Sequence, residues 1–233
     1  MCINNKLADF AKVGRVILGV ARNYKPLKNP PRDPIIFAKL PSAYLTPNAT
    51  NSNHVVIPQG FVVKADVSLG VVIGSKAKRI EEGEADCVIG GYCLAMDLTA
   101  TTPLEYLMEN RLPWTIAKSF NTSCVVSNFI PAKKLYNPYD TELWLKLNGD
   151  LVQKANTKDM HTSIAEIITY ISRYITLYPN DLILTGSPHS IANHPAQLNH
   201  EDVVECGLGK DVSMKVKVLE ETQLSDEDLV LNF

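Results

Sequence analysis

The stretch VVKADVSLGVVIG, residues 62–74, indicates the fold because it reads as one long strand. Apolar and polar residues alternate from Val63 to Ser68, and a continuous apolar run follows. This pattern is typical of a strand that passes from a half-exposed to a fully buried position in a sheet. Asp66 and Ser68 are two residues apart, so their side chains point to the same face. A carboxylate and a hydroxyl aimed together could be half of a metal site, or what is left of one.

The remaining segments also favour strands over helices. Asn148-Gly149 predicts the two-residue turn of a hairpin over residues 143–156. The clearest helix is predicted over 163–177, where apolar residues recur at helical spacing after a Ser cap with Glu three residues on. Thr102 is expected to cap a second helix that begins at Pro103. Further strands are predicted at 15–21, 35–40, 88–96, 181–188 and 211–221.

These elements indicate a single α+β domain, mainly β, over residues 15–221. A short helical segment (1–14) precedes it, and an acidic tail (222–233) follows. Residues 1–15 carry three basic side chains between apolar ones at helical spacing. A small amphipathic helix explains this pattern, and a weak mitochondrial signal is the alternative.

Composition excludes several classes of partner. The chain has 233 residues, a net charge of −2 and a pI near 6.2, which gives no reason to expect a nucleic-acid partner. No apolar run reaches the roughly 18–20 residues that span a membrane, so no membrane insertion is expected. The five cysteines are widely spaced without a Cys-x-x-Cys pair, which favours reduced thiols.

The wording and order of nine segments resemble the fumarylacetoacetate hydrolase family, and most of all its short eukaryotic branch that acts on acylpyruvates and oxaloacetate. The segments are GVARNY, IFAKLPSAYL, LGVVIG, GGYCLAMDLTA, LPWTIAKSF, LWLKLNGDLVQ, ITYISRYITL, DLILTGSP and VSMKVKV. The resemblance implies a distorted β-roll with short flanking helices, usually assembled as a homodimer.

The resemblance also implies a Mg²⁺ or Mn²⁺ site made by a Glu-x-Glu and an Asp. These three positions fall on Asp66, Ser68 and Asp97. Hard divalent ions prefer oxygen ligands. Asp66 is shorter than Glu by one carbon–carbon bond, about 1.5 Å, and Ser68 brings no charge. We therefore expect Asp66 and Asp97 to be a vestigial metal site, with no cofactor or only weak binding of Mg²⁺ or Mn²⁺.

Two further features that the resemblance implies are missing. The family's short lid helix carries a His and a Glu that activate the attacking water, and these positions are Leu27 and Pro30. Neither side chain can accept a proton, and the prolines predict an extended loop over 25–34. The arginine that can clamp a substrate carboxylate is replaced by Thr101.

Several polar residues match the family pattern. Lys118 is the residual catalytic candidate, although a structural pairing with Asp97 or Asp66 accounts for it as well. By resemblance, the substrate-binding candidates are Arg22, Tyr24, Gln153, Thr185 and Gly186. Arg22 and Tyr24 have an alternative role in anchoring a turn. A loop with His189, His194 and His200 has no common zinc spacing and is expected to be solvated, with a replacement metal site or base as the alternative.

The damaged metal site, water-activating pair and clamp lead to the hypothesis of a pseudoenzyme. The chain would have lost its hydrolase or decarboxylase activity and would serve as a structural, binding or assembly subunit with protein partners. It would form a homodimer or a larger complex, mitochondrial by resemblance, with the cytosol as the alternative. The alternative function is an active Mg-dependent acylpyruvate hydrolase, or an oxaloacetate tautomerase or decarboxylase.

Overall fold

The long strand predicted at 62–74 lies at the centre of the molecule as β5 (Val63–Ile73). In the computed structural model, which describes residues 7–47, 54–191 and 196–223, it pairs along its length with antiparallel β6 (Ile89–Ala100). Both strands are buried over most of their length because both sides of the sheet are covered. The predicted alternation followed by an apolar run therefore identified the central strand correctly.

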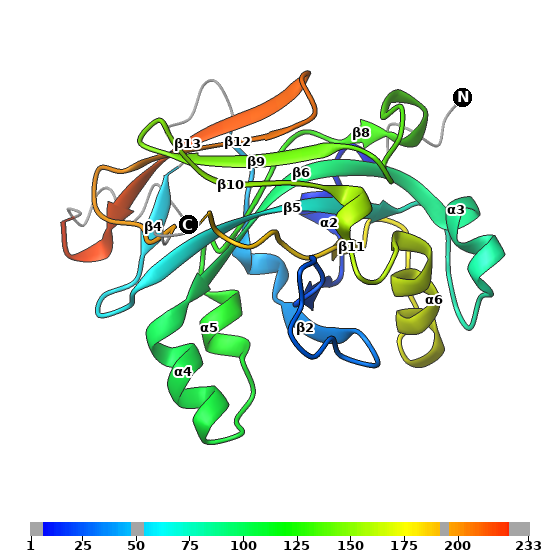
Figure 1. Cartoon of the computed structure of the whole chain (residues 1–233), viewed down its shortest axis with the longest axis horizontal. Helices are drawn as coiled ribbons and strands as arrows, with labels where there is room; N and C mark the ends of the chain where they lie inside the picture. Colours follow the sequence, from blue (N-terminus) through cyan, green and yellow to red (C-terminus); the bar gives the residue numbers. More distant parts are fainter. Residues whose placement is uncertain (1–6, 48–53, 192–195, 224–233) are drawn as a thin grey trace.

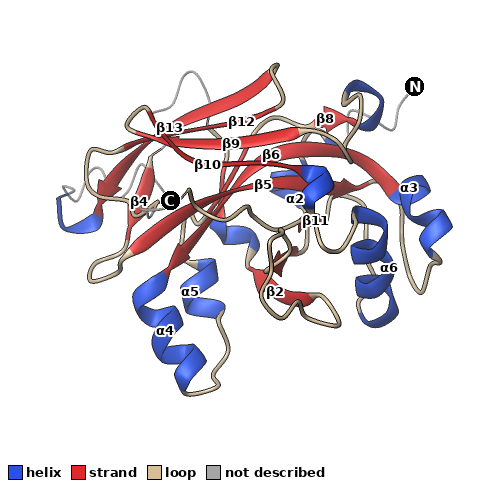
Figure 2. Ribbon diagram, viewed as in Figure 1, coloured by secondary structure: helices blue, strands red, loops and turns tan. Residues whose placement is uncertain are grey.

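Two sheets make up the fold (Figures 1 and 2). The first has eight strands in the order β2-β1-β11-β5-β6-β7-β3, with β8 also paired to β6. Its other strands are β1 (Ile17–Ala21), β2 (Ile35–Lys39), β3 (Tyr44–Leu45), β7 (Cys124–Val126), β8 (Ile130–Pro131) and β11 (Leu182–Leu184). The second has the order β10-β9-β12-β13-β4. Its strands are β4 (Val55–Ile57), β9 (Glu142–Leu147), β10 (Asp150–Asn156), β12 (Val203–Leu208) and β13 (Val212–Glu220).

The core lies between the two sheets. Val67 and Leu69 of β5, Leu94 of β6 and Leu145 of β9 belong to one continuous cluster and are almost completely buried. In Figure 1 the second sheet lies above β5 and β6, while short helices lie below them. The predicted fold class, mainly β with short flanking helices, is confirmed.

The helices are short and lie at the periphery. They are α2 (Phe10–Val13), α3 (Ala85–Val88), α4 (Thr101–Glu109), α5 (Thr115–Ser119) and α6 (Ile164–Tyr174). The predicted capping box of α6 is present, with reciprocal bonds between Ser163 and Glu166. The predicted cap of α4 is wrong. The Thr102 hydroxyl accepts the Val62 N–H instead, and the helix begins at Thr101.

The loop over residues 25–34 contains no helix, as the prolines predict. Within the described residues, no helix is long and apolar enough to cross a membrane. The four cysteines in the described part of the chain, Cys87, Cys93, Cys124 and Cys206, are free thiols. Residues 1–6, and 224–233 of the predicted acidic tail, lie outside the described part of the chain, so the domain boundaries remain a prediction.

Candidate functional site

Asp97 of β6 lies between two lysines. Its Oδ2 accepts a hydrogen bond of 2.8 Å from Lys118 Nζ, and its Oδ1 lies 2.9 Å from Lys39 Nζ. The strand register places Asp66 of β5 directly opposite Asp97, so both carboxylates lie on one face of the sheet. These four residues, Asp66, Asp97, Lys39 and Lys118, form an acidic–basic cluster.

Lys39 holds three chain segments together beside Asp97. Its ammonium donates to the carbonyls of Leu98, Lys118 and Ser123 at 2.5–2.9 Å, and its side chain is fully buried. An ammonium has three hydrogens, so none remains for Asp97 Oδ1. The contact with Asp97 is therefore an ion pair without a hydrogen bond, and Oδ1 accepts none from any described residue.

Lys118 differs because its hydrogen bonds go to side chains. Its Nζ donates to Asp97 Oδ2 and, at 2.7 Å, to Thr99 Oγ1. It also lies 4.2 Å from the centre of the Phe37 ring, a cation–π contact. One of its three hydrogens is not used in these bonds, so Lys118 can donate to a bound molecule.

A cavity of about 380 Å³ adjoins the cluster on the α5 side. Phe37, Trp114 and Thr115 line it, and Phe37 is the residue shared with the Lys118 contact. The four charged side chains do not belong to its lining, so the cavity lies beside the cluster and does not enclose it. Its mainly apolar walls suit the carbon skeleton of a small ligand.

Asp66 is fixed by Gln153, which reaches across from the second sheet. Gln153 Nε2 donates to Asp66 Oδ1 at 2.5 Å and to Pro188 O at 3.1 Å, and its Oε1 accepts the Val67 N–H at 2.8 Å. Gln153 is completely buried with all of these groups satisfied. Asp66 is only partly buried. The predicted binding residue Gln153 thus positions Asp66.

The two carboxylates have different electrostatic surroundings. Burial raises the pKa of Asp66, the Asp97 charge adds to this, and Lys118 opposes it. Burial would also raise the pKa of Asp97, but Lys118 and Lys39 outweigh it and hold this pKa below its usual value. Burial lowers the pKa of Lys39, with Asp97 opposing. Environments that separate the pKa values of neighbouring acids are typical of acid–base sites, although structural ion pairs produce them too.

Thr185 and Gly186 follow β11 and run beside β5. Thr185 donates from both its N–H and its hydroxyl to Leu69 O, each at 3.0 Å. Gly186 has φ +101°, and a Cβ there would lie 2.8 Å from Asn23 Cβ. Its carbonyl accepts the Ser68 hydroxyl at 2.9 Å. Thr185 and Gly186 therefore support β5 next to Asp66, through the bonds to the Leu69 carbonyl and from the Ser68 hydroxyl.

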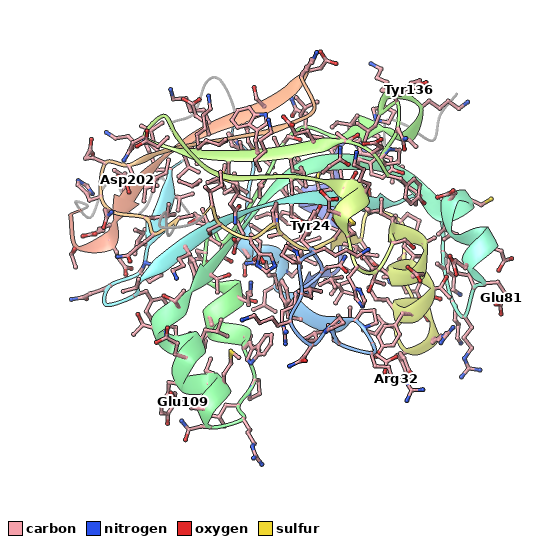
Figure 3. The ribbon with its side chains drawn as sticks, in the orientation of Figure 1. Tyr24, Arg32, Glu81, Glu109, Tyr136 and Asp202 are labelled. Carbon is pink, nitrogen blue, oxygen red and sulfur yellow. The ribbon has the colours of Figure 1, made fainter. Side chains whose placement is uncertain are left out.

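The structure does not bring Arg22 or Tyr24 to the cluster. Arg22 Nη2 donates to Lys28 O at 2.9 Å and Asn29 O at 3.4 Å, which anchors the 25–34 loop. Tyr24 lies near the centre of the molecule (Figure 3) and is 1% exposed. Its hydroxyl has no partner among the described residues. The turn-anchoring alternative describes Arg22 better than substrate binding does.

The residues present do not fit the three-carboxylate metal site that the resemblance implies. The hydroxyl of Ser68 is fully buried and already donates to Gly186 O. Each oxygen of Asp97 lies against an ammonium, and a divalent ion at the same oxygens would have to displace or face those cations. Of the three ligand positions, Asp66, Ser68 and Asp97, only Asp66 has a carboxylate that lies more than 4 Å from every lysine of the described residues.

The two described histidines of the predicted His189/His194/His200 loop do not come together. His189 Nε2 lies about 3 Å from the carbonyls of Tyr24 and Pro26, and His200 Nδ1 accepts the Glu220 N–H. His194 lies outside the described residues. Among the described residues, no three His, Cys, Asp or Glu side chains gather as metal ligands would.

Sequence reasoning gave Lys39 and Thr99 no role in the site. A lysine at an inward position of the apolar strand IIFAKL is a usable signal, because a buried lysine needs a partner. Thr99 lies two residues after Asp97 on the same strand and so shares its face. Both could have been placed beside Asp97 on these grounds.

Comparisons with known proteins match the whole domain. The family model for the fumarylacetoacetate hydrolase C-terminal domain matches residues 5–219. "Oxaloacetate tautomerase FAHD1, mitochondrial" of Mus musculus is 37% identical over 224 residues, covering 94% of this chain and 98% of the relative. "Oxaloacetate decarboxylase, mitochondrial" of Dictyostelium discoideum is 35% identical over 218 residues, covering 90% and 96%.

A solved structure shows the same fold. It is fumarylpyruvate hydrolase from Pseudomonas aeruginosa, in complex with Mn²⁺ and pyruvate. Its TM-score is 0.81 at 23% identity, and the match covers 89% of this chain and 91% of that one. At this identity the likeness concerns the fold alone.

The hypothesis of a pseudoenzyme is wrong. Relatives that match this chain along almost their whole length carry the names of enzymes, a tautomerase and a decarboxylase. The hypothesis gave most weight to missing residues, among them the pair that would activate a water for hydrolysis. Moving a proton within a keto acid needs no such water, and the acidic–basic cluster is intact. The names therefore favour the alternative, an active enzyme of oxaloacetate chemistry.

Proposed function

The chain belongs to the fumarylacetoacetate hydrolase family, and from this premise we propose that it catalyses the keto–enol tautomerisation of oxaloacetate or a similar 2-oxo dicarboxylate. The observation that carries the proposal is the cluster itself, in which Lys118 and two carboxylates share one face of the sheet beside a cavity. The tautomerase name of the relatives supports the choice of substrate.

Tautomerisation moves one proton between C3 of the keto acid and the oxygen on C2. The intermediate is an enolate, whose negative charge develops on that oxygen. A fixed cation with a hydrogen to donate stabilises such an oxygen, and a nearby carboxylate can carry the proton. The reaction consumes no water and leaves no group behind, so it needs neither a lid nor a water-activating pair.

Lys118 is the group that we assign to the oxygen. Its unused hydrogen can bond the C2 oxygen, while Asp97 and Thr99 fix the direction of the ammonium. Phe37 beneath Nζ excludes water from one side. Asp97 also compensates the Lys118 charge in the resting site.

Asp66 is the group that we assign to the proton at C3. It faces the same side as Lys118 and is the more exposed of the two carboxylates. Gln153 holds its Oδ1, which leaves the second oxygen to take the proton from carbon and return it to the C2 oxygen. Proton transfer by a positioned side chain contributes about 10²–10⁴-fold.

Decarboxylation of oxaloacetate is the second candidate. It passes through an enolate on the same oxygen, so Lys118 would serve it in the same way, and one relative carries this name. Hydrolysis of acylpyruvates is less well supported. Leu27 and Pro30 lie in a loop without a helix and offer no base for an attacking water.

The proposal also covers the cellular location, the metal binding and the assembly of the chain. Relatives are named mitochondrial, which supports a mitochondrial location for this chain. We expect Mg²⁺ or Mn²⁺ to bind weakly if they bind, because Ser68 and Asp97 are already engaged. We also expect the chain to form a homodimer or part of a larger complex, as the family resemblance implies.

The test follows oxaloacetate supplied as its enol by the loss of the enol's ultraviolet absorbance. Wild-type protein should accelerate this loss over buffer, and both Lys118→Met and Asp66→Asn should reduce the acceleration by about 10²–10³-fold. Lys154→Met is the control, because Lys154 is an exposed surface lysine paired with Glu142. If the enol disappears no faster with wild-type protein than in buffer, the proposal is refuted.

A further inference from the structure

Lys64 lies on the same face of β5 as Asp66, two residues before it. Val63 and Ala65, which alternate with Lys64 along the strand, are completely buried in the core between the two sheets. The Lys64 side chain is only partly buried and leaves β5 on the opposite side. A third lysine therefore stands on the face of the sheet that carries the acidic–basic cluster.

The strand register places Lys64 directly opposite Thr99 of β6, just as Asp66 lies opposite Asp97. Side chains that face each other in this way have Cβ atoms about 4.5–5.5 Å apart. Thr99 is the residue whose hydroxyl accepts a hydrogen bond of 2.7 Å from Lys118. Lys64 and Lys118 are therefore both neighbours of Thr99, one from β5 and the other from α5.

The backbone at Lys64 is paired on both sides. Besides the pairing with β6, Lys64 forms a bridge with Gln197. The bridge is flanked by hydrogen bonds from Ala65 N–H to Ala196 O, at 3.0 Å, and from Leu198 N–H to Val63 O, at 2.9 Å. The position of Lys64 relative to Asp66 and Thr99 is thus fixed by the fold.

The ammonium of Lys64 forms no ion pair or hydrogen bond with any residue in the described part of the chain. Asp66, the acid next to it on the strand, has its Oδ1 held by Gln153. The Lys64 charge lowers the pKa of Asp66, but Lys118 has the larger effect in this direction. Lys64 is therefore near the cluster and keeps its three hydrogens for another partner.

The charge of the site is suited to a dianion only when Lys64 is included. The acidic–basic cluster alone contains two carboxylates and two ammonium groups. A dicarboxylate carries two further negative charges at neutral pH, which the existing carboxylates would repel. Lys64 adds a positive charge that can compensate one carboxylate of the ligand.

We propose that Lys64 binds the C4 carboxylate of the 2-oxo dicarboxylate and so makes the site select such an acid over one that lacks this charge. The assignment of this carboxylate rests on the proposed function, which sets Lys118 at the C2 oxygen and Asp66 at C3. C4 is bonded to C3, and Lys64 is the cation next to Asp66 on the same strand face. Lys64 holds the substrate and takes no part in the proton transfer.

Steady-state kinetics with the enols of oxaloacetate and of its 4-methyl ester test the proposal, because the ester lacks only the C4 charge. Wild-type protein should prefer oxaloacetate. Lys64→Met should raise KM for oxaloacetate about 10–100-fold and change kcat by less than about twofold, the pattern of a lost binding contact. The ester should be converted as by wild type. Lys64→Arg keeps the charge and should keep most of the preference.

Lys78→Met is the matched control. Lys78 is an exposed lysine that follows the other end of β5 and has no ion pair with a described residue. Its loss should leave both KM values unchanged. An equal rise of KM in Lys78→Met would show a general effect of protein charge and overturn the proposal. So would a rise for the ester as large as that for oxaloacetate in Lys64→Met, or no change of KM in Lys64→Met.

Calorimetric titration with malate tests the binding without the reaction. Malate has both carboxylates of oxaloacetate and a hydroxyl in place of the keto oxygen, and Lys64→Met should weaken its binding about tenfold or more. If wild type does not accelerate enol loss but malate binding shows this dependence on Lys64, the proposed function fails and the carboxylate site stands. If wild type is active but Lys64→Met binds malate as wild type does, the carboxylate site fails and the proposed function stands. Absence of malate binding by wild type also overturns the carboxylate site.

Discussion

Two lysines contact the same carboxylate, and we predict that removing them has opposite consequences. Lys39→Met should destabilise the protein strongly while leaving the chemistry of the folded molecules nearly intact. Lys118→Met should destabilise it little and remove most of the activity. Methionine has nearly the length of lysine, so both variants test the ammonium group and not the packing of the stem.

The magnitudes follow from the hydrogen bonds. Lys39→Met leaves three buried carbonyls without their donor, and each such group costs about 1–3 kcal/mol. Breaking a buried ion pair costs about 3–5 kcal/mol in total, a large part of the 5–15 kcal/mol that stabilises a typical domain. Lys118→Met loses bonds to Asp97 and Thr99 only, and Asp97 keeps Lys39 as its counterion. We expect about 1–2 kcal/mol for that loss.

Urea unfolding followed by circular dichroism measures the free energy of unfolding of each variant. The enol assay, at a temperature where both variants are folded, measures their activity. The Lys39→Met protein should keep its rate per folded molecule within about tenfold, while Lys118→Met should lose about 10²–10³-fold. Equal losses of stability would show that the carbonyl bonds of Lys39 are not what stabilises the site. Equal losses of activity would remove the distinction between a supporting and a reacting lysine.

Three further predictions concern the metal, the pH dependence and the backbone. Calorimetry should find Mn²⁺ binding no tighter than millimolar; micromolar affinity that Asp97→Ala abolishes would contradict this. Burial raises the pKa of Asp66 in the folded protein, so the wild type loses stability as the pH rises from about 4, the unfolded pKa, through the raised folded pKa. Asp66→Asn has no such charge to bury. In urea titrations it should therefore be more stable than wild type at pH 8 and nearly equal to it at pH 3. Gly186→Ala should lower the free energy of unfolding by more than the roughly 1–3 kcal/mol of backbone strain, because the new Cβ would also meet Asn23. Gly149→Ala, at φ +93° with no atom near its Cβ, should lose only the strain energy. Equal shifts of the melting temperature in the two variants would argue against the contact with Asn23.

Local patterns in the sequence predicted the elements that depend on neighbours in the chain. The Asn148-Gly149 turn joins β9 to β10, and Ser163 with Glu166 starts α6, because turns and caps are decided within a few residues. The α4 cap failed for the opposite reason. Thr102 bonds to Val62, forty residues earlier, and no local pattern contains that contact.

The site shows the same division. Alternation placed Asp66 and Ser68 on one face, but the register that sets Asp66 opposite Asp97 is decided by pairing between distant strands. The role of Lys39 depends on three carbonyls from β6 and from around α5, which no spacing reveals. The function was misjudged because the residues missing for hydrolysis were given more weight than the acid and base that remain, on which the tautomerase alternative rested.

The segment after β11 has a consequence for solubility. β5 pairs with β11 only over Gly70–Val72, and along its earlier half the same side is covered by backbone contacts such as Ala65 N–H to Ala196 O and by the Gln153 side chain. An uncovered edge of a long apolar strand is a template for adding strands from other molecules. Cleavage within this segment would expose such an edge, and the protein would then be expected to aggregate through β5 long before its core unfolds.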